Sequence, residues 1–262
     1  MTLTGDGGDA NIDTVGFNLS LHSVLSGPGG LNKLGTGELD LYANNTYTGS
    51  TTISSGSLGL DSHASLASKL INVAGGARFY CGAFDLVAGQ TLKGSGKFIG
   101  NLTVHGIHAP GDSPGIETVQ GNYNMLGQLQ IELAGTTPGT GYDQVLVSGT
   151  DPYNSTLAGT LALDWTGMGG SSASTRLWIF ENDTAGTLSG AFGNYANGSL
   201  VGNYDGRDWF IWYGANAATG NLTGGNDVVI AAVPEPCAIF LLLMTTLFAL
   251  ALLLNRGLFA SR

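Results

Sequence analysis

The stretch HGIHAPGD carries residue types that bind metal ions. His105, His108 and Asp112 offer two imidazoles and a carboxylate, which are common ligands of zinc. On a strand, positions three apart face opposite sides, so the two imidazoles converge only if Gly106 interrupts the strand. We therefore expect no metal site in this stretch.

Two aspartate-containing stretches have the composition of calcium-binding turns. One contains Asp6, Asp9 and Asp13, and the other is GGND at residues 224–227. The first lacks the spacing of a calcium loop, and the second occurs once, whereas calcium-binding solenoids repeat such turns. Turn formation is the simpler explanation, and the sequence predicts neither a metal nor a cofactor.

An enzyme that cleaves polysaccharides on a β-helix needs carboxylates grouped with each other or with a cation. Six candidates in the second half of the chain follow no motif: Asp143, Asp164, Glu181, Asp205, Arg207 and Asp208. A nearby aromatic cluster could stack on sugar rings, although such clusters are more often core: Trp209, Phe210, Trp212 and Tyr213. We expect no catalytic residue and therefore no enzyme.

The composition indicates which elements position these side chains. The chain has 262 residues, of which 43 are glycines and only 11% are charged. Abundant Gly, Ser, Thr and Asn favour short strands and tight turns over helices. The net charge of −10 argues against nucleic acid as a partner, because phosphate binding needs clustered Lys and Arg.

An internal repeat is the strongest organisational signal. Four glycines follow one another every 19 residues, with an apolar residue four positions after each. The glycines are Gly37, Gly56, Gly75 and Gly94, and the apolar residues are Leu41, Leu60, Phe79 and Phe98. A period near 20 suits one coil of a β-solenoid, in which stacking buries alternate side chains and glycines occupy corners. The sequence predicts an all-β fold, namely a right-handed parallel β-helix.

The end of the chain differs in kind from the repeats. Residues 118–232 keep strand-like alternation without the 19-residue frame, which predicts an irregular β continuation or cap. Ala238 to Leu254 is a charge-free apolar run that would form a helix of about 26 Å, near the lower limit for a membrane span. Arg256 and Arg262 follow it, so the positive-inside rule predicts a single-pass anchor with a cytoplasmic C-terminus.

Residues 27–60, GPGGLNKLGTGELDLYANNTYTGSTTISSGSLGL, closely resemble the autotransporter-associated β-strand repeat. The matching positions include Gly30, Leu31 and Lys33, and then the Asn-Thr-Tyr run that begins at Asn45. The turn PGDSPG at residues 110–115 resembles a turn downstream of such repeats. The resemblance implies a surface protein.

The last 30 residues resemble the PEP-CTERM sorting signal. Val233, Pro234, Glu235 and Pro236 form its motif, and a predicted span and a short basic tail follow. The resemblance implies an exopolysaccharide-producing Gram-negative source and an exosortase as partner, which processes the chain near the motif. Pro236 disfavours helix just before the span and keeps the motif extended.

Together these patterns divide the chain into four parts. We expect lead-in strands at 1–26, the solenoid at 27–117, the irregular cap at 118–232 and the sorting signal at 233–262. The implied protein is a non-enzymatic structural or adhesive one, held in the inner membrane in transit and then placed at the cell surface. Membrane, exosortase and exopolysaccharide or matrix are its expected partners.

Two other interpretations stay open at this point. One is a polysaccharide-acting β-helix enzyme or a carbohydrate-binding module, which would show three or more charged side chains converging in one groove. The other is a fragment of a larger surface protein, since residues 1–30 lack the charged start and apolar run of a signal peptide.

Overall fold

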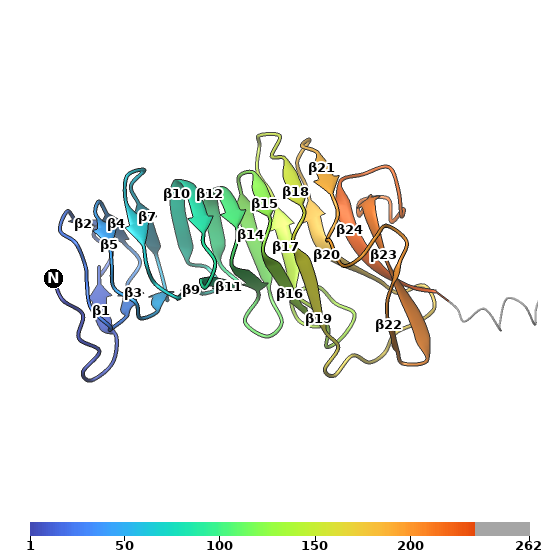
Figure 1. The fold of residues 1–262 in the computed structure, drawn as a ribbon, viewed down its shortest axis with the longest axis horizontal. Helices are drawn as coiled ribbons and strands as arrows, with labels where there is room; N and C mark the ends of the chain where they lie inside the picture. Colours follow the sequence, from blue (N-terminus) through green and yellow to red (C-terminus); the bar gives the residue numbers. More distant parts are fainter. Residues whose placement is uncertain (234–262) are drawn as a thin grey trace, which may run out of the picture.

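The computed structural model describes residues 1–233, and within them every regular element is a β-strand. The strands form a stack of coils in one elongated body, with the N-terminus at one end and β24 (Asp227–Val233) near the other (Figure 1). The predicted all-β class and parallel solenoid are confirmed for this part of the chain, while the hand of the coil stays a prediction.

Residues 1–233 contain no helix that is long and apolar enough to cross a membrane. The predicted span from Ala238 to Leu254 lies outside the described residues, as do Arg256 and Arg262.

Two large sheets and one small sheet run along the stack. The 8-stranded sheet contains, in spatial order, β1 (Ala10–Asp13), β3 (Leu31–Leu34), β6 (Thr51–Ile53), β9 (Leu70–Val73), β11 (Thr91–Gly94), β13 (Ile107–Pro110), β16 (Gln128–Glu132) and β19 (Thr160–Asp164). The main path of the 14-stranded sheet is β2 (Leu19–Leu21), β4 (Glu38–Leu41), β7 (Ser57–Leu60), β10 (Arg78–Leu86), β12 (Lys97–Val104), β14 (Ile116–Gln120), β17 (Gln144–Val147), β20 (Arg176–Asn182), β24, β23 (Arg207–Ala215) and β22 (Leu200–Tyr204). Its side branch is β15 (Tyr123–Met125), β18 (Ser155–Leu157) and β21 (Leu188–Gly190), and the small sheet is β5 (Asn44–Asn45) with β8 (Ser65–Leu66).

The alternation of side chains along each strand builds the core. Phe79 of β10 pairs with Leu58 of β7 on one side and with Phe98 of β12 on the other. The Phe79 and Phe98 rings meet edge to face with centroids 5.4 Å apart, and both are fully buried. Inward side chains of successive coils thus stack into continuous rows, as expected for a solenoid.

The strict 19-residue frame needs a correction. Leu41 pairs with Leu60, and Phe79 pairs with Phe98, so the frame holds within each of these two steps. Between them it slips by two residues, because Phe79 stacks on Leu58 and not on Leu60. An even slip keeps every side chain on its original face, so the core pattern survives it.

The four repeat glycines consequently occupy different places. Gly56 lies at a corner with φ +66°, where a Cβ would come within 2.5 Å of the Gly35 carbonyl oxygen. Gly37 takes the equivalent place one coil earlier, since the following residues pair in register. Gly75 is exposed in a turn, and Gly94 ends β11 in the other sheet, where it pairs with Pro110.

A lysine points into the core of the first coils. Lys33 is fully buried in β3, where it pairs with Ile12 and Ile53. Its ammonium donates hydrogen bonds to the carbonyl oxygens of Leu34, Gly35 and Ser55 at 2.9, 2.9 and 3.2 Å. Burial lowers the pKa of Lys33, and the nearby Asp13 carboxylate partly opposes that effect. Lys33 therefore stabilises the corner after β3, because its ammonium provides hydrogen-bond donors for three backbone carbonyls.

The parallel ladders continue across residue 118 into the second half. β14 pairs with β17 and β17 with β20 in parallel, while β16 pairs with β19. The coils lengthen here, since Leu129 pairs with Leu161, 32 residues later. Beyond β20 the direction changes, because β24, β23 and β22 add on as antiparallel strands. Residues 118–232 thus contain both a solenoid continuation and the antiparallel end of the 14-stranded sheet (Figure 1).

Candidate functional site

A groove of about 550 Å³ lies on the 8-stranded sheet. It lies over β11, β13, β16 and β19 and over the turn that follows β13. Four carboxylates and one ammonium line it: Asp112, Glu132, Asp143, Asp164 and Lys93. It therefore meets the geometric condition set by the sequence for a polysaccharide-acting site.

The ladder and the turn bring these carboxylates together. Glu132 and Asp164 are direct partners on β16 and β19, so they project from the same face of strands about 4.8 Å apart. The Ser113 hydroxyl donates a hydrogen bond to Glu132 Oε2 at 2.9 Å. Asp143 accepts the backbone N–H groups of Gly115 and Glu132, each at 2.8 Å, and so ties the turn to β16.

Two carboxylates of the groove have pKa values shifted in opposite directions. Burial raises the pKa of Asp143 to about 6, against the lowering effect of its two backbone donors. The hydroxyl and backbone N–H of Thr166 lower the pKa of Asp164, which is exposed. A pair of this kind can hold one protonated and one ionised carboxyl below about pH 6, as acid–base chemistry on sugars requires.

A cluster of three polar side chains, His108, Glu117 and Tyr123, lies inside the solenoid. His108 occupies an inward position of β13 between Leu92 and Leu129. Its Nε2 lies 3.0 Å from Glu117 Oε2, and its Nδ1 lies 2.8 Å from the Tyr123 hydroxyl. All three side chains are completely buried, and Glu117 Oε1 has no hydrogen-bond partner among the described residues.

This buried group cannot reach a substrate from its position in the core. Both ring nitrogens of His108 are engaged, and burial raises the pKa of Tyr123 well above its ordinary value. His105, by contrast, is exposed and contacts Asp85 at 2.7 Å. A bend at His105 and Gly106 separates β12 from β13, so the strand is interrupted between the two histidines. The imidazoles still do not converge, because His105 is exposed and His108 is buried, and Asp112 accepts the Ser95 hydroxyl instead. Among residues 1–233, the structure brings no three His, Cys, Asp or Glu side chains into a metal-binding group.

Ser113 is a groove residue that reasoning from the sequence missed. The spacing Gly111, Ser113, Gly115 fits the Gly-x-Ser-x-Gly pattern of serine hydrolases, and Ser113 has a strained φ of +71°. That pattern works in a strand–turn–helix context with a histidine beside the serine. Here strand β14 follows the turn, and the hydroxyl donates to Glu132. The spacing signal was present, but the structural context for nucleophilic catalysis is not met.

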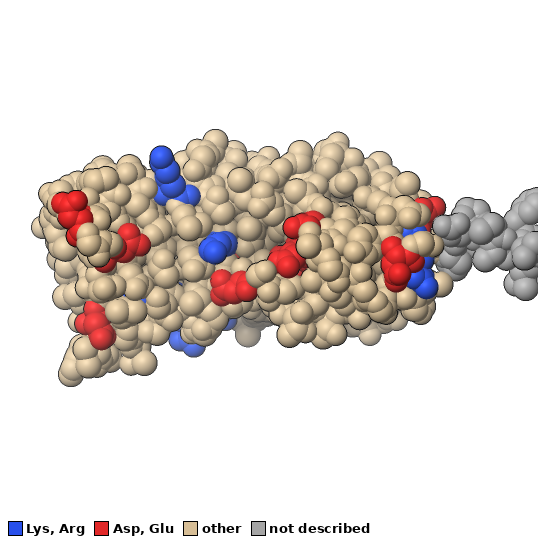
Figure 2. Space-filling model, turned by 90° about the horizontal axis from the view of Figure 1, so that it is seen from below, with Lys and Arg blue, Asp and Glu red and all other residues tan. Residues whose placement is uncertain are grey.

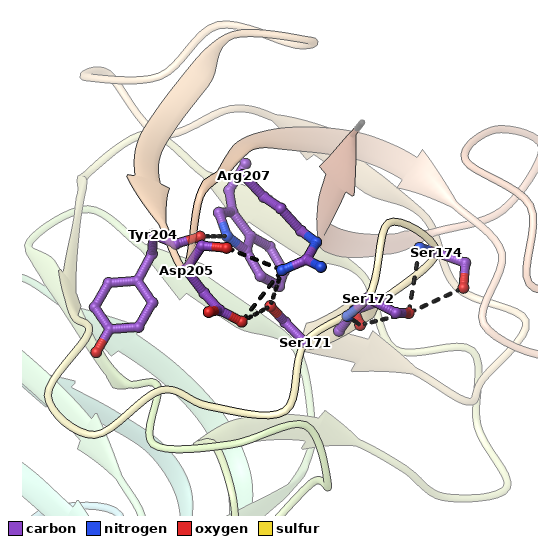
Figure 3. A network of polar contacts seen from close by, with 8 residues as sticks. Ser171, Ser172, Ser174, Tyr204, Asp205 and Arg207 are labelled. Carbon is purple, nitrogen blue, oxygen red and sulfur yellow. Dashed lines mark hydrogen bonds and ion pairs between the residues drawn. The ribbon is translucent and has the colours of Figure 1, made fainter. Parts of the chain in front are cut away.

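The other candidates from the sequence lie apart from the groove. Glu181 lines a separate hollow with Asp183 and Asp227. Arg207 Nη1 donates to the Asp205 carbonyl at 2.9 Å and contacts the Asp205 carboxylate at 3.2 Å (Figure 3). Ser171 donates to the same carboxylate at 2.8 Å, so this network fastens a loop to the β22–β23 turn (Figure 3). On the face drawn in Figure 2, charged side chains lie in small scattered groups, and at the right-hand end acidic and basic ones adjoin.

Strand alternation divides the aromatic cluster of β23. Trp209 is fully buried in the core, and its indole N–H donates to the Tyr204 carbonyl oxygen at 3.2 Å. Phe210 and Trp212 occupy the opposite face, where Trp212 pairs with Val229 and Val229 pairs with Trp178. Tyr213 donates to the Tyr195 carbonyl oxygen at 2.8 Å. The four residues therefore do not form one sugar-stacking surface.

The aspartate-rich stretches form turns and coil contacts. Asp9 accepts the Gly30 N–H at 3.0 Å and the Ser50 hydroxyl at 2.7 Å, and Asp13 accepts the Val15 N–H at 2.9 Å. Of the predicted sorting motif, Val233 ends β24, while Pro234, Glu235 and Pro236 lie outside the described residues.

The buried pair of His108 and Glu117 predicts that a single substitution lowers stability more than the double substitution does. His108→Leu leaves the Glu117 carboxylate unpaired in the core and should lower the free energy of unfolding by about 3–5 kcal/mol. Adding Glu117→Leu removes that carboxylate and should recover most of the loss. Urea-induced unfolding measures both, with His105→Leu at the exposed pair as a control that costs about 1 kcal/mol or less. A double variant no more stable than His108→Leu would contradict this account.

The groove carboxylates predict opposite dependences of stability on pH. Because the folded pKa of Asp143 is raised to about 6, its contribution to stability falls as pH rises from its ordinary value through about 6. Asp143→Asn should therefore gain stability relative to the unsubstituted chain across that window. Asp164 has a lowered pKa, so Asp164→Asn should become less stable relative to the unsubstituted chain as pH rises from that lowered pKa to the ordinary value. Thermal unfolding from below the ordinary aspartate pKa to above pH 6 covers both windows, and slopes of the same sign in the two windows would contradict the assignment.

Comparison with known proteins identifies the repeat. Residues 31–60 match the family model described as passenger-associated-transport-repeat. The chain is 30% identical over 230 residues to "Adhesin BmaC autotransporter" of Brucella suis biovar 1 (strain 1330), a match that covers 76% of this chain and 7% of that protein. It is 28% identical over 202 residues to "Uncharacterized protein YuaQ" of Escherichia coli (strain K12), covering 72% of this chain and 13% of that protein.

The chain thus spans 7% and 13% of the lengths of these two curated relatives. The family model falls within β3 to β7, the coils that Lys33 closes and that the sequence resemblance singled out. Residues 31–60 therefore carry an autotransporter-associated repeat, as the sequence predicts.

Proposed function

We propose that this chain is a non-enzymatic protein of the cell surface or extracellular matrix with a structural or adhesive role. The observation that carries the proposal is the autotransporter-associated repeat, set in a solenoid whose ladders run from β1 to β21. Similarity to a protein named as an autotransporter adhesin supports the adhesive role. A long stack of coils offers an extended surface for contact with a partner.

The C-terminal residues complete the proposal with a sorting route. β24 includes residues up to Val233, and the Pro-Glu-Pro of the motif follows directly in the sequence. In this proposal Ala238 to Leu254 holds the chain in the inner membrane, and Arg256 with Arg262 keeps the C-terminus cytoplasmic. An exosortase then processes the chain near the motif, and the β domain reaches the surface, where exopolysaccharide or matrix contacts it.

Removal of the tail tests the sorting route. In a bacterium that encodes an exosortase, the full chain should become accessible to protease on intact cells and lose its C-terminal residues by mass spectrometry. Deletion of 234–262, or Glu235→Ala with Pro236→Ala, should abolish C-terminal processing. Thr245→Ala within the apolar run is the matched control and should behave as the unsubstituted chain does. Identical processing in a strain without exosortase would contradict the route, and a chain that stays in the cytosol would contradict the surface role.

A polysaccharide-acting enzyme is the second candidate, and the acidic groove is the observation that favours it. Asp143 and Asp164 line one groove with Lys93, and their pKa values are shifted in opposite directions. Against it, both Asp143 oxygens accept backbone N–H groups, and only 6% of this residue is exposed. These hydrogen bonds give Asp143 a structural role, because they link the turn to β16.

Incubation with polygalacturonate and alginate separates the two candidates. The leading proposal expects no new reducing ends from the purified full chain. The enzyme candidate predicts that the chain releases new reducing ends, and that Asp143→Asn or Asp164→Asn reduces this release by ~10²-fold or more. Asp151→Asn, an exposed carboxylate outside the groove, is the control that should leave any release unchanged.

A further inference from the structure

A second groove, of about 340 Å³, opens on the outer face of the 14-stranded sheet near the N-terminal end. Its volume falls within the ~300–1,000 Å³ typical of small-molecule sites. Tyr42, Tyr80, Asp40, Asp61, Ser62 and Gly82 are the lining residues that carry its chemistry. Two phenol rings beside two carboxylates make it unlike the acidic groove over β16 and β19.

The groove exists because β7 and β10 diverge. The ladder between them ends at the Gly59–Tyr80 pair. The register of β10 against β12 shifts between Tyr80 and Ala83, which is a β-bulge. Such bulges bend the strand and redirect side chains. The sheet therefore opens beside Cys81 and Gly82, although the coils on either side stay stacked.

A glycine at the floor of the groove fixes the first ring. Asp40, Gly59 and Tyr80 are direct neighbours in one outward row of β4, β7 and β10. Tyr80 crosses over Gly59, and its hydroxyl donates to Asp40 Oδ1 at 2.9 Å. A Cβ on Gly59 would lie 2.7 Å from Tyr80 Cζ, so a side chain there would displace the ring. The Tyr80 phenol is thus held in place before any ligand binds.

The second ring is exposed and supported from behind. Tyr42 is 42% exposed and stacks on His22 of the preceding coil, with centroids 4.4 Å apart and planes 17° apart. His22 covers one face of the phenol. Ser62, on the following coil, also lines the groove. A stacked pair of this kind presents a rigid apolar surface at low entropic cost.

The polar groups of the groove suit hydroxyls. Asp61 accepts the His63 N–H at 3.0 Å, and this bond holds its pKa below the usual range. Asp40 accepts the Tyr80 hydroxyl at Oδ1 and also has the Glu38 carboxyl as a close neighbour, and the several lone-pair sites of a carboxylate leave room for a further donor. Carboxylates accept two hydroxyl donors side by side, whereas they repel anionic ligands. The groove therefore favours a neutral ligand rich in hydroxyl groups.

We propose that this groove binds a neutral glycan, with one pyranose ring stacked on Tyr42 and its hydroxyls donating to Asp40 and Asp61. The inference rests on the proposed function in one respect, because it names the ligand class through which an adhesive surface would act. Binding in the groove is non-covalent, and Cys81 at its edge is buried with its pKa raised to about 12.

Direct binding by the purified full chain tests the proposal. The probes are cellohexaose, laminarihexaose and mannohexaose, each titrated by calorimetry, with polygalacturonate as the acidic comparison. We expect at least one neutral hexasaccharide to bind, and Tyr42→Ala to weaken it by about tenfold or more, equivalent to ~1.4 kcal/mol. Tyr42→Phe keeps the ring and should bind as the unsubstituted chain does.

A second variant fills the groove without disturbing the fold. The φ of Gly82 lies outside the left-handed region, and a Cβ added there would meet no atom within 4 Å, so Gly82→Leu should fold normally and block binding. Val87→Ala, at an exposed residue outside the groove, is the matched control. The proposal is overturned if no neutral hexasaccharide binds, if polygalacturonate alone binds, or if neither Tyr42→Ala nor Gly82→Leu weakens binding. The binding assay uses purified protein, so its result is independent of the surface-exposure test on cells. Failure of glycan binding can therefore be distinguished from failure of the proposed surface role.

Discussion

The structure depends on one constraint, which is that the backbone of each coil finds its hydrogen-bond partners in the next coil. Short strands such as β3 and β6 cannot satisfy their N–H and C=O groups alone, and no coil buries its apolar face without a neighbour. Parallel stacking solves both problems at once, from β1 to β19 in one sheet and from β2 to β20 in the other. At the far end, antiparallel β24, β23 and β22 take over the pairing.

Stacking also explains why polar side chains in the interior have hydrogen-bond partners there. An inward position on a strand remains inward whatever residue occupies it, so His108 is enclosed between Leu92 and Leu129. Inside, it contacts Glu117 and Tyr123. Lys33 meets the same condition with backbone carbonyls. Burying such groups without partners would cost several kcal/mol, so each of these interior polar groups is tied to the coils around it.

The two grooves arise where the repeat is interrupted. Coils in regular register present flat outer faces, because each residue lies beside its counterpart. The bulge in β10 opens the groove beside Tyr80. The turn after β13, held to β16 through Asp143, borders the groove with Asp164. Departures from the repeat therefore create the two grooves in this solenoid.

The sequence by itself determined the all-β class and the stacked repeat, because these follow from alternation and period along the chain. It also carried the repeat pattern that residues 31–60 match. Only the tertiary structure decided the two-residue slip at Phe79, the pairing of His108 with Glu117, and the meeting of Tyr80 with Asp40 across Gly59. The physical reason is that each of these depends on which residues of different coils become neighbours. That register is set by the lengths of the turns and by the bulge, which no local pattern records.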